Sequence, residues 1–211
     1  MILLYSYIFY YIAALIGISI GYHRYFTHRS FQTTPTLENL MLFLGLICGG
    51  RSVLTWAAVH RMHHAKSDTE DDPHSPLYIG MWRVLTSRWQ VNYIPKKYIK
   101  DLLKNKRVTF FHRYGKYIHS AYAVIMLLGG IDLFLIFVVG PYILSWISFG
   151  LLNYFAHQGG KPKNIPILNI IAPGEGWHEQ HHLKPMAISL HKYDIAGFFI
   201  ERLFIKTKYG S

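Results

Sequence analysis

The hydrophobic residues gather in three long stretches, and the first of them predicts a helix that crosses a membrane. Residues 1–22 contain no charged side chain, and this is about the length that a helix needs to span the hydrocarbon core. A secretory signal peptide would carry a basic start and a small-residue cleavage site, and neither is present in this segment. We therefore expect a retained transmembrane helix over about residues 2–22.

The second stretch, Ile118 to Leu152, is too long for one crossing and predicts a hairpin of two helices. Its single charged residue, Asp132, follows closely after a pair of glycines. A charge in the middle of a single span would be costly, whereas the turn between two short spans is exposed to water. We expect two crossing helices here, over about 118–131 and 133–152.

The third stretch, Leu37 to Cys48, predicts a helix that does not cross the membrane. Thr34 suits the N-cap and Pro35 the first helical position, and a Gly-Gly pair ends the run. About a dozen apolar residues are too few for a crossing, and they fit a buried, interfacial or re-entrant helix.

Charge decides the orientation predicted for these helices. The chain has 22 Lys and Arg against 11 Asp and Glu, and all of its basic residues lie within 24–116 or 161–208. Because basic residues concentrate in cytoplasmic segments, we expect residues 23–117 and 153–211 on the cytoplasmic side and the N-terminus outside. A membrane thus explains the net charge of +11, and with an apolar fraction of 51% we expect no nucleic-acid partner.

These patterns together predict an all-α integral membrane protein with about three transmembrane helices and a cytoplasmic helical cap, in one domain over residues 1–211. The single cysteine, Cys48, excludes a disulfide framework and a Cys-based metal site. Residues 195–205 predict an amphipathic helix that either lies on the membrane surface or packs on the cap. Its apolar residues include Phe198, Phe199, Leu203 and Phe204.

Thirteen histidines are many for this length, and most of them fall into four short clusters. Two clusters have the spacing His-x-x-His-His, which places all three rings on one face of a helix while the last two diverge enough to serve two neighbouring metal ions. A third is an Asn-x-x-x-His pair on one helical face. The fourth is a pair five residues apart, which meets in one site only if its helix ends or distorts. The clustered residues are His23, His28, His60, His63, His64, Asn153, His157, His178, His181 and His182.

Nine imidazoles exceed what one ion binds, and they match two ions with four or five nitrogens each. Imidazole suits Fe, Zn, Cu and Ni, and coordination positions left open distinguish a reactive centre from a closed structural zinc site. Oxygen chemistry needs such open positions. The remaining four histidines are interpreted as ordinary core or surface residues; they are His74, His112, His119 and His191.

The motifs around these histidines resemble those of the integral-membrane fatty acid desaturases, in the branch that includes acyl-CoA and bacterial Δ9 acyl-lipid desaturases. The similarity covers about residues 17–185. It is carried by the Asn153–His157 element and by three segments, which are GYHRYFTHRSF from Gly21, WAAVHRMHHAKSDTEDDPHSP from Trp56 and GEGWHEQHH from Gly174.

The resemblance implies an O2-dependent oxidoreductase, a Δ9-type desaturase that inserts a cis double bond into a fatty acyl chain during unsaturated fatty acid biosynthesis. Two iron ions, replaceable by zinc in a purified sample, would be bound by the nine clustered histidines, and Asn153 would hold a metal-bound water. The substrate would be an acyl-CoA or an acyl-lipid. The centre would face the cytoplasm, in the bacterial inner membrane or the endoplasmic reticulum.

The chain departs from the family pattern in two ways. Members usually have four spans, and the first is expected to be missing here, which affects how the outer end of the substrate tunnel is closed. A His-Pro-Gly-Gly segment like that of cytochrome b5 does not occur in the sequence. We therefore expect a separate electron donor such as cytochrome b5 or ferredoxin.

Several neighbouring residues have two interpretations from the sequence. Trp56 and Trp177 either line the acyl tunnel or belong to an interfacial aromatic belt. The nearby carboxylates either orient the histidine rings or are exposed loop acids; they are Asp68, Glu70, Asp71, Asp72 and Glu175. A basic run either meets CoA phosphates or an acidic electron donor, or attracts lipid headgroups; it comprises Lys96, Lys97, Lys100, Lys104, Lys106 and Arg107.

Two other functions compete with desaturation. A sterol or carotenoid hydroxylase uses similar histidine motifs, but the spacing of His23 and His28 and the Asp-Asp-Pro-His segment favour a desaturase. A metal transporter would place its ligands within the spans, near mid-membrane. The predicted spans contain only Asp132 at a turn and His119 at a border.

Overall fold

The computed structural model describes residues 1–88, 91, 93–203 and 205–206, and most of this chain is helical. Helix α1 (Ile2–Ala14) continues without a break into the π-helical segment η1 (Leu15–Thr27). Together they form one apolar helix of 26 residues. This helix extends beyond the predicted end near residue 22, so that His23 lies within it.

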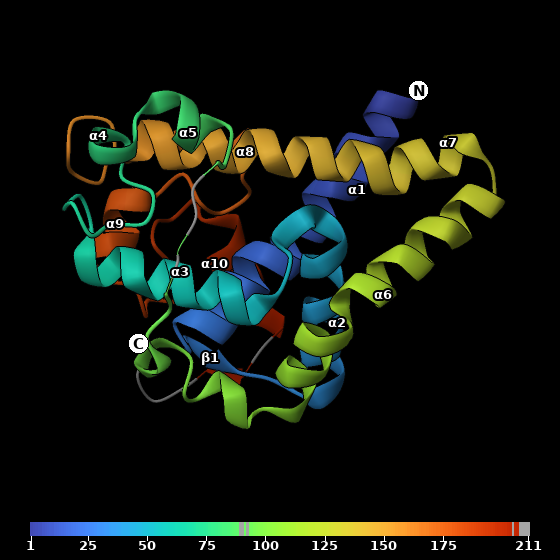
Figure 1. Cartoon of the computed structure of the whole chain (residues 1–211), viewed down its shortest axis with the longest axis horizontal. Helices are drawn as coiled ribbons and strands as arrows, with labels where there is room; N and C mark the ends of the chain where they lie inside the picture. Colours follow the sequence, from blue (N-terminus) through green and yellow to red (C-terminus); the bar gives the residue numbers. More distant parts are fainter. Residues whose placement is uncertain (89–90, 92, 204, 207–211) are drawn as a thin grey trace.

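The second apolar stretch forms a hairpin whose turn falls at two glycines. Helix α6 (Lys106–Leu128) ends at Gly129, and Gly130 has a φ of 129°, which glycine adopts without strain. The chain then runs back as one continuous helix, which leaves the turn at the right-hand end of Figure 1. Its parts are α7 (Ile131–Phe134), η5 (Leu135–Val139) and α8 (Gly140–Ala156).

Two of the described helices are long and apolar enough to span a membrane, Ile2–Thr27 and Ile131–Ala156. The crossing predicted over 118–131 corresponds to the second half of α6. The first half of that helix is basic, with Lys106, Arg107, Arg113 and Lys116. By length and composition, α6 is therefore not among the helices that are apolar enough to span a membrane.

The third apolar stretch forms a bent pair of helices that is either a broken span or a re-entrant segment. Helix α2 (Pro35–Gly45) and η2 (Leu46–Gly50) lead into α3 (Val53–Lys66) through a bend of 73°. The Thr34 hydroxyl accepts a hydrogen bond from the Leu37 N–H. This contact confirms the predicted N-cap.

Helix α2 packs directly on η1, and glycine permits the contact. A Cβ atom on Gly17 would overlap the backbone at Gly45, and a Cβ atom on Gly45 would overlap the Tyr22 ring. Because packed interiors leave no room for such atoms, both positions require glycine. The contact fixes the histidine-bearing end of η1 against the bent pair.

Short elements complete the polar end of the molecule. Helix α10 packs on η1 through a buried face of Ala196, Gly197 and Ile200, while Phe198 and Leu203 are exposed. Phe204, part of the predicted amphipathic segment, lies outside the described residues. The short elements are β1 (Phe31–Gln32), α4 (Pro76–Ile79), α5 (Met81–Leu85), η3 (Lys96–Tyr98), η4 (Leu102–Lys104), η6 (Pro166–Ile170), α9 (His178–Leu183), α10 (Ile195–Leu203) and β2 (Ile205–Lys206), which pairs antiparallel with β1.

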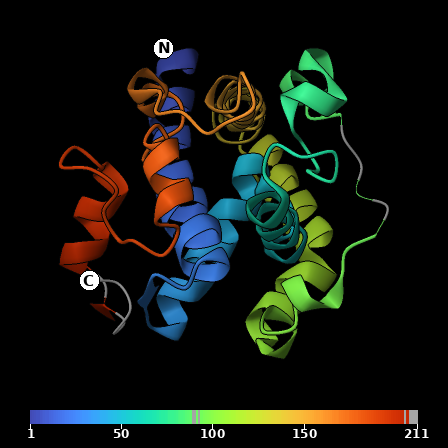
Figure 2. The same ribbon diagram turned by 90° about the vertical axis from the view of Figure 1, so that its left-hand side faces the viewer.

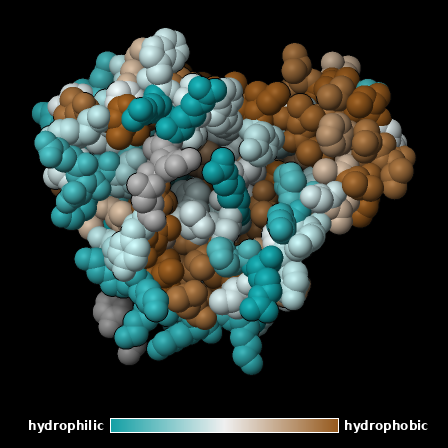
Figure 3. Space-filling model, viewed as in Figure 1, coloured by the Kyte–Doolittle hydropathy of each residue, from teal (hydrophilic) through white to brown (hydrophobic). Residues whose placement is uncertain are grey.

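The surface separates into an apolar end and a polar end. Apolar residues gather around the hairpin turn, where Leu128 is 83% exposed, and polar residues cover the opposite end (Figure 3). Seen from that polar end, η1, α3, α8 and α9 come together (Figure 2). These four elements carry the histidine clusters, so the clusters lie away from the apolar tip.

Candidate metal centre

The π-helical geometry of η1 brings together the two histidines that are five residues apart. The N–H of His28 donates to the carbonyl of His23 at 3.1 Å, an i→i+5 hydrogen bond. The Thr27 hydroxyl donates to the Tyr22 carbonyl at 2.7 Å with the same spacing. The rings of His23 and His28 consequently lie 5.0 Å apart. The distortion that the sequence required for these two rings to meet is therefore present.

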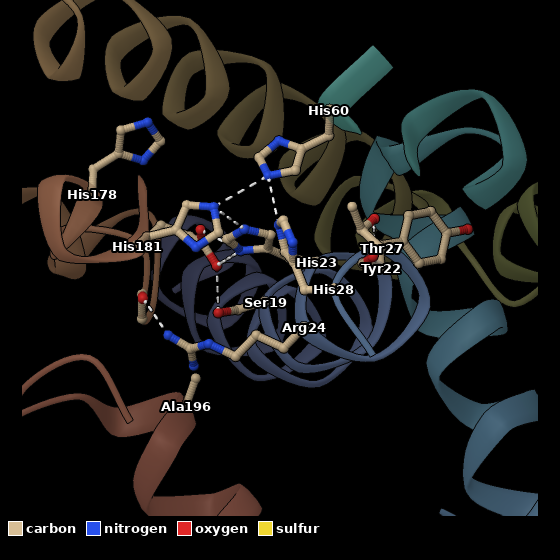
Figure 4. A network of polar contacts seen from close by, with 12 residues as sticks. Ser19, Tyr22, His23, Arg24, Thr27, His28, His60, His178, His181 and Ala196 are labelled. Carbon is tan, nitrogen blue, oxygen red and sulfur yellow. Dashed lines mark hydrogen bonds and ion pairs between the residues drawn. The ribbon is translucent and has the colours of Figure 1, made fainter. Parts of the chain in front are cut away.

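These two rings belong to a first group of five histidines, drawn from η1, α3 and α9. The Nε2 atom of His181 lies 3.0 Å from that of His23, 3.3 Å from that of His60 and 2.7 Å from that of His64. The Nε2 atom of His60 lies 3.1 Å from that of His28. Figure 4 shows the rings of His23, His28, His60 and His181 pointing toward one another.

A second group of four histidines lies directly beside the first. The Nε2 atom of His63 lies 3.1 Å from that of His157 and 3.2 Å from that of His182. His178 closes the group, 2.8 Å from His157 and 3.2 Å from His182. The groups are adjacent, since the rings of His64 and His182 stack at 4.3 Å.

Each His-x-x-His-His cluster divides its rings between the two groups. In α3 the first and last positions join the first group and the middle histidine, His63, joins the second. In α9 the assignment is reversed, because His181 joins the first group. Positions i+3 and i+4 of a helix diverge by about 100°, so two neighbouring rings point into different groups.

The spacing of the nitrogens fits two imidazole-bound ions. Ligands 2.0–2.1 Å from a shared ion lie roughly 3 Å from each other, and neighbouring Nε2 atoms in each group lie 2.7–3.3 Å apart. Four ligand atoms of each group fall within 4.8 Å of one another. All nine histidines predicted from the sequence are thus brought together.

Three carboxylates orient these rings through their Nδ1 atoms. Glu175 lies 2.7 Å from Nδ1 of His23, Asp72 lies 2.9 Å from that of His63, and Asp68 lies 3.1 Å from that of His157. A carboxylate at Nδ1 fixes the ring with Nε2 free to bind a metal. The two other predicted acids do not contact the rings: Asp71 pairs with Lys66 at the surface, and Glu70 is exposed.

Burial keeps the rings of α9 neutral. The pKa of His178 and that of His181 lie well below the usual value, because desolvation and the neighbouring histidines disfavour a charged ring, and the pKa of His182 falls to about 2. Burial acts to raise the pKa of Glu175, but His23 and other donors outweigh it and lower the pKa. Neutral imidazole is the form that binds metals.

An apolar pocket reaches the histidine groups, and two further residues that the sequence singled out line it. Asn153 and Trp56 line it beside His60, and the Trp56 ring stacks on that of His60 at 4.9 Å. Trp177 is not among the lining residues; its ring stacks on His191 at 3.8 Å. Of the two predicted tunnel residues, the structure therefore places Trp56 on the pocket and Trp177 away from it.

Sequence reasoning passed over several residues that support the site. His74, interpreted as ordinary, is buried, stacks on His63 at 4.2 Å and lines the pocket. Arg24 is buried against Asp194, the residue that caps α10, with the two side chains 2.9 Å apart. Figure 4 shows Arg24 directed away from the histidines. For His74, its position two residues after Asp72 was the one sign in the sequence that it lies near the site.

Arg61 ties the two histidine-bearing helices together. Its guanidinium donates to the carbonyls of Phe26 and Thr27 at the end of η1 and to that of Tyr98. Asp101 holds it in place with contacts of 2.7 and 3.0 Å. Sequence spacing alone offered no sign of this long-range contact.

Comparison with known proteins agrees with the fold and the histidine geometry. The fatty acid desaturase family model matches residues 2–196, and the protein belongs to this family. It is 30% identical to an sn-1 stearoyl-lipid 9-desaturase of Anabaena variabilis, over 82% of this chain and 68% of that protein. It is 31% identical to a hex-5-enoyl-[acyl-carrier protein] acetylenase of Moorena producens, over 80% of this chain and 62% of the relative.

The name of a third relative gives CoA as the acyl carrier. The chain is 30% identical to an acyl-CoA C20 Delta5-desaturase of Anemone leveillei, over 82% of this chain and 60% of the relative. The chain thus spans between about three-fifths and two-thirds of the length of these proteins.

Proposed function

We propose that this protein is a fatty acyl desaturase, an oxidoreductase that inserts a cis double bond into an acyl chain in unsaturated fatty acid biosynthesis. The observation that carries the proposal is the apolar pocket that ends at His60 and Asn153, beside two adjacent groups of histidine nitrogens. Family membership supports the reaction. The names of relatives acting on stearoyl- and palmitoyl-lipid support a double bond of the Δ9 type.

The donor set fits two ions that accept imidazole, and we infer iron from the family. The first group would hold one ion through His23, His28, His60, His64 and His181. The second would hold the other through His63, His157, His178 and His182, with Asn153 near a bound water. When bound, the iron pair would activate O2 as the oxidant of the acyl chain. Zinc is expected to substitute in some purified samples.

The balance of the reaction defines what else the protein needs. Two hydrogens leave adjacent methylenes, and with two electrons and two protons they reduce O2 to two waters. We infer a separate electron donor such as cytochrome b5 or ferredoxin, and a membrane-embedded acyl-CoA or acyl-lipid substrate. The protein's own residues hold the chain in the pocket, where Trp56 and Phe149 exclude water, and keep the histidine rings oriented through their carboxylates.

Location follows from the two apolar helices and the family, which support a membrane protein. We propose that the hairpin of α6 and α8 enters the membrane and that the histidine groups lie on the cytoplasmic side, in the bacterial inner membrane or the endoplasmic reticulum. Figure 3 supports placing the histidine groups outside the hydrocarbon core, because the end of the molecule opposite the apolar hairpin turn is polar.

The hydroxylase alternative is not favoured, because the relatives named above are desaturases and an acetylenase. Expression in a host that lacks unsaturated fatty acids tests the proposal, with mass-spectrometric location of any new double bond. A His63→Ala variant at matched protein level serves as the inactive control. A hydroxylated product, or saturated lipids despite iron-loaded protein and an active donor, would contradict it.

A further inference from the structure

One long helix supplies a row of hydrogen-bond donors to the segment that leads into α9. The Tyr7 hydroxyl donates to the Ile170 carbonyl at 2.6 Å, and the Tyr10 hydroxyl donates to the Ile171 carbonyl at 2.5 Å. Both tyrosines lie on α1, and its continuation η1 donates to residues 174 and 175. This helix therefore sets the course of the segment before it reaches the histidines of α9.

The contact nearest the first histidine group is made by Glu175. Its carboxylate accepts a hydrogen bond from the Ser19 hydroxyl at 2.6 Å and lies 2.7 Å from Nδ1 of His23. The Nε2 atom of His23 in turn lies 3.0 Å from that of His181. The position of Glu175 thus determines how His23 is presented to the first group.

Arg24 holds the residue that precedes Glu175. Its Nη2 atom donates both to the Gly174 carbonyl at 3.0 Å and to the Asp194 carboxylate at 2.9 Å. A Cβ atom on Gly174 would lie only 2.7 Å from that of Ala196, so Gly174 is enclosed between η1 and α10. Figure 4 shows the Arg24 side chain running toward Ala196, away from the histidine rings.

Asp194 connects this contact to the start of α10. Its Oδ1 atom accepts hydrogen bonds from the N–H groups of Ala196 and Gly197 at 3.1 and 3.2 Å, and so caps the helix. Its Oδ2 atom accepts from Arg24 and from the Leu190 N–H, each at 2.9 Å. Asp194 therefore anchors the Arg24 guanidinium to α10, which itself packs on η1.

Stability alone does not account for this buried pair. Arg24 is 1% exposed, and its Nε and Nη1 atoms have no hydrogen-bond partner among the residues that the structure describes. Burying unpaired N–H groups is costly, and buried ion pairs often contribute little net stability. The paired nitrogen, Nη2, is the one that reaches Gly174. The pair is thus arranged around the segment that carries Glu175.

We propose that Arg24 is a positioning residue for the first histidine group. Through the Gly174 carbonyl it holds Glu175 in place, and Glu175 orients His23 so that the group binds its ion more tightly. This inference rests on the metal centre of the proposed desaturase. The carboxylates of the second group lie on a different segment, residues 68–72, so the effect is confined to the first group.

Titration with Co²⁺ against a competing chelator tests this role without turnover, because cobalt accepts the same imidazole ligands. The full chain in detergent is followed by the visible absorption of the bound cobalt. Each histidine group is measured in a chain whose other group lacks two ligands. His157→Ala with His178→Ala isolates the first group, and His28→Ala with His60→Ala isolates the second.

The informative variants alter the charge pair and preserve the cap of α10. Arg24→Met with Asp194→Asn gives a charge-free variant, and Asp194→Asn alone removes only the anchor of Arg24; the asparagine oxygen can cap the helix in both. In Arg24→Lys, one ammonium supplies the two donors that Nη2 supplies in the wild type. The control is Arg107→Met with Glu38→Gln, which removes an ion pair between α6 and α2 whose carboxylate is also buried.

We expect the first group of the charge-free variant to bind Co²⁺ about tenfold more weakly, the lower end of the loss that follows when a partner of a metal ligand is replaced. Asp194→Asn alone should act in the same direction, and it serves as the test if the charge-free variant does not fold. Arg24→Lys should bind as the wild type does, because Nε and Nη1 contribute no hydrogen bond. The second group and the control should not change.

Thermal unfolding of the metal-free chains separates positioning from stability. A role in stability alone would lower the unfolding temperature and leave the affinities of the two groups in their wild-type ratio. Three results would overturn the inference: wild-type cobalt affinity of the first group in the variants that lack the charge of Asp194, an equal loss in both groups, or an equal loss in the control.

The cobalt titration and the desaturation assay can fail independently. Arg24-dependent cobalt binding in a protein that forms no double bond would refute desaturation and leave the positioning role standing. Formation of a double bond by a protein whose cobalt binding does not depend on Arg24 would refute the positioning role alone.

Discussion

The two histidine groups differ in how they are built, although they share α3 and α9. The first has five nitrogens, takes two of them from η1 and the residue that follows it, and is supported by one carboxylate, Glu175. The second has four nitrogens, takes one from the end of α8, and is supported by two carboxylates, Asp68 and Asp72. The first group therefore relies on more ligands, and the second on a more firmly oriented set.

The largest effect should follow from removing a ligand of either group. His63→Ala and His181→Ala are each expected to lower desaturation more than about 100-fold, since loss of a ligand exceeds the 10–100-fold cost of losing an outer-shell partner. Metal content should fall below two ions per chain. His112→Ala removes a ring that lies outside both groups and should retain most activity. Equal losses in all three variants would refute the assignment of ligands.

The carboxylates test the difference in support. Glu175→Gln leaves the first group without a carboxylate partner, whereas Asp72→Asn leaves the second group with Asp68. We expect metal affinity to fall by about 100-fold for Glu175→Gln and by about 10-fold for Asp72→Asn. These values are the two ends of the loss that follows when a residue hydrogen-bonded to a metal ligand is replaced. Competition with a chelator measures both. Asp71→Asn is the control, because Asp71 pairs with Lys66 at the surface; the reverse order of the first two would refute the comparison.

A smaller effect concerns the contact that holds η1 to α3. Burial raises the pKa of Asp101, but hydrogen bonds from Arg61 and Arg29 outweigh it and lower the pKa to about 2, from 3.8. This stabilisation is present above pH 3.8 and is lost as the pH falls toward 2. Thermal unfolding of wild type and Asp101→Asn in detergent should therefore converge over that interval. A stability difference that persists at pH 2 would show that the charge of Asp101 is not responsible.

The smallest effect tests the π-helical turn. Thr27→Val keeps the shape of the side chain and removes the hydroxyl that donates to the Tyr22 carbonyl. The loss should destabilise the protein by about 1 kcal/mol, a typical hydrogen bond. It should weaken metal binding by the first group more than by the second. Thr69→Val, which removes a hydroxyl contact at an exposed turn, provides the comparison in the same unfolding and chelator measurements.

Local spacing predicted the parts of the site that depend on a single helix. The triplets of α3 and α9, the Thr34 cap and the glycines of the hairpin turn all follow from periodicity or turn chemistry. The sequence did not reveal which rings would share a group, because this depends on how α3 and α9 face each other. It also gave no sign of the buried Arg24–Asp194 pair, whose members are 170 residues apart.

The rings of α3 and of α9 are each divided between the two groups, and this division affects how the metal centre assembles. Neither group is complete on one side of the interface, because α3 and α9 each contribute to both. Because both helices hold ligands of each ion, binding of one ion by these residues would align the helices and order the remaining histidines for the other. Uptake should be cooperative, so that a half-loaded sample consists of chains with two ions and chains with none, and singly loaded chains are scarce. Native mass spectrometry during a metal titration would resolve these populations directly.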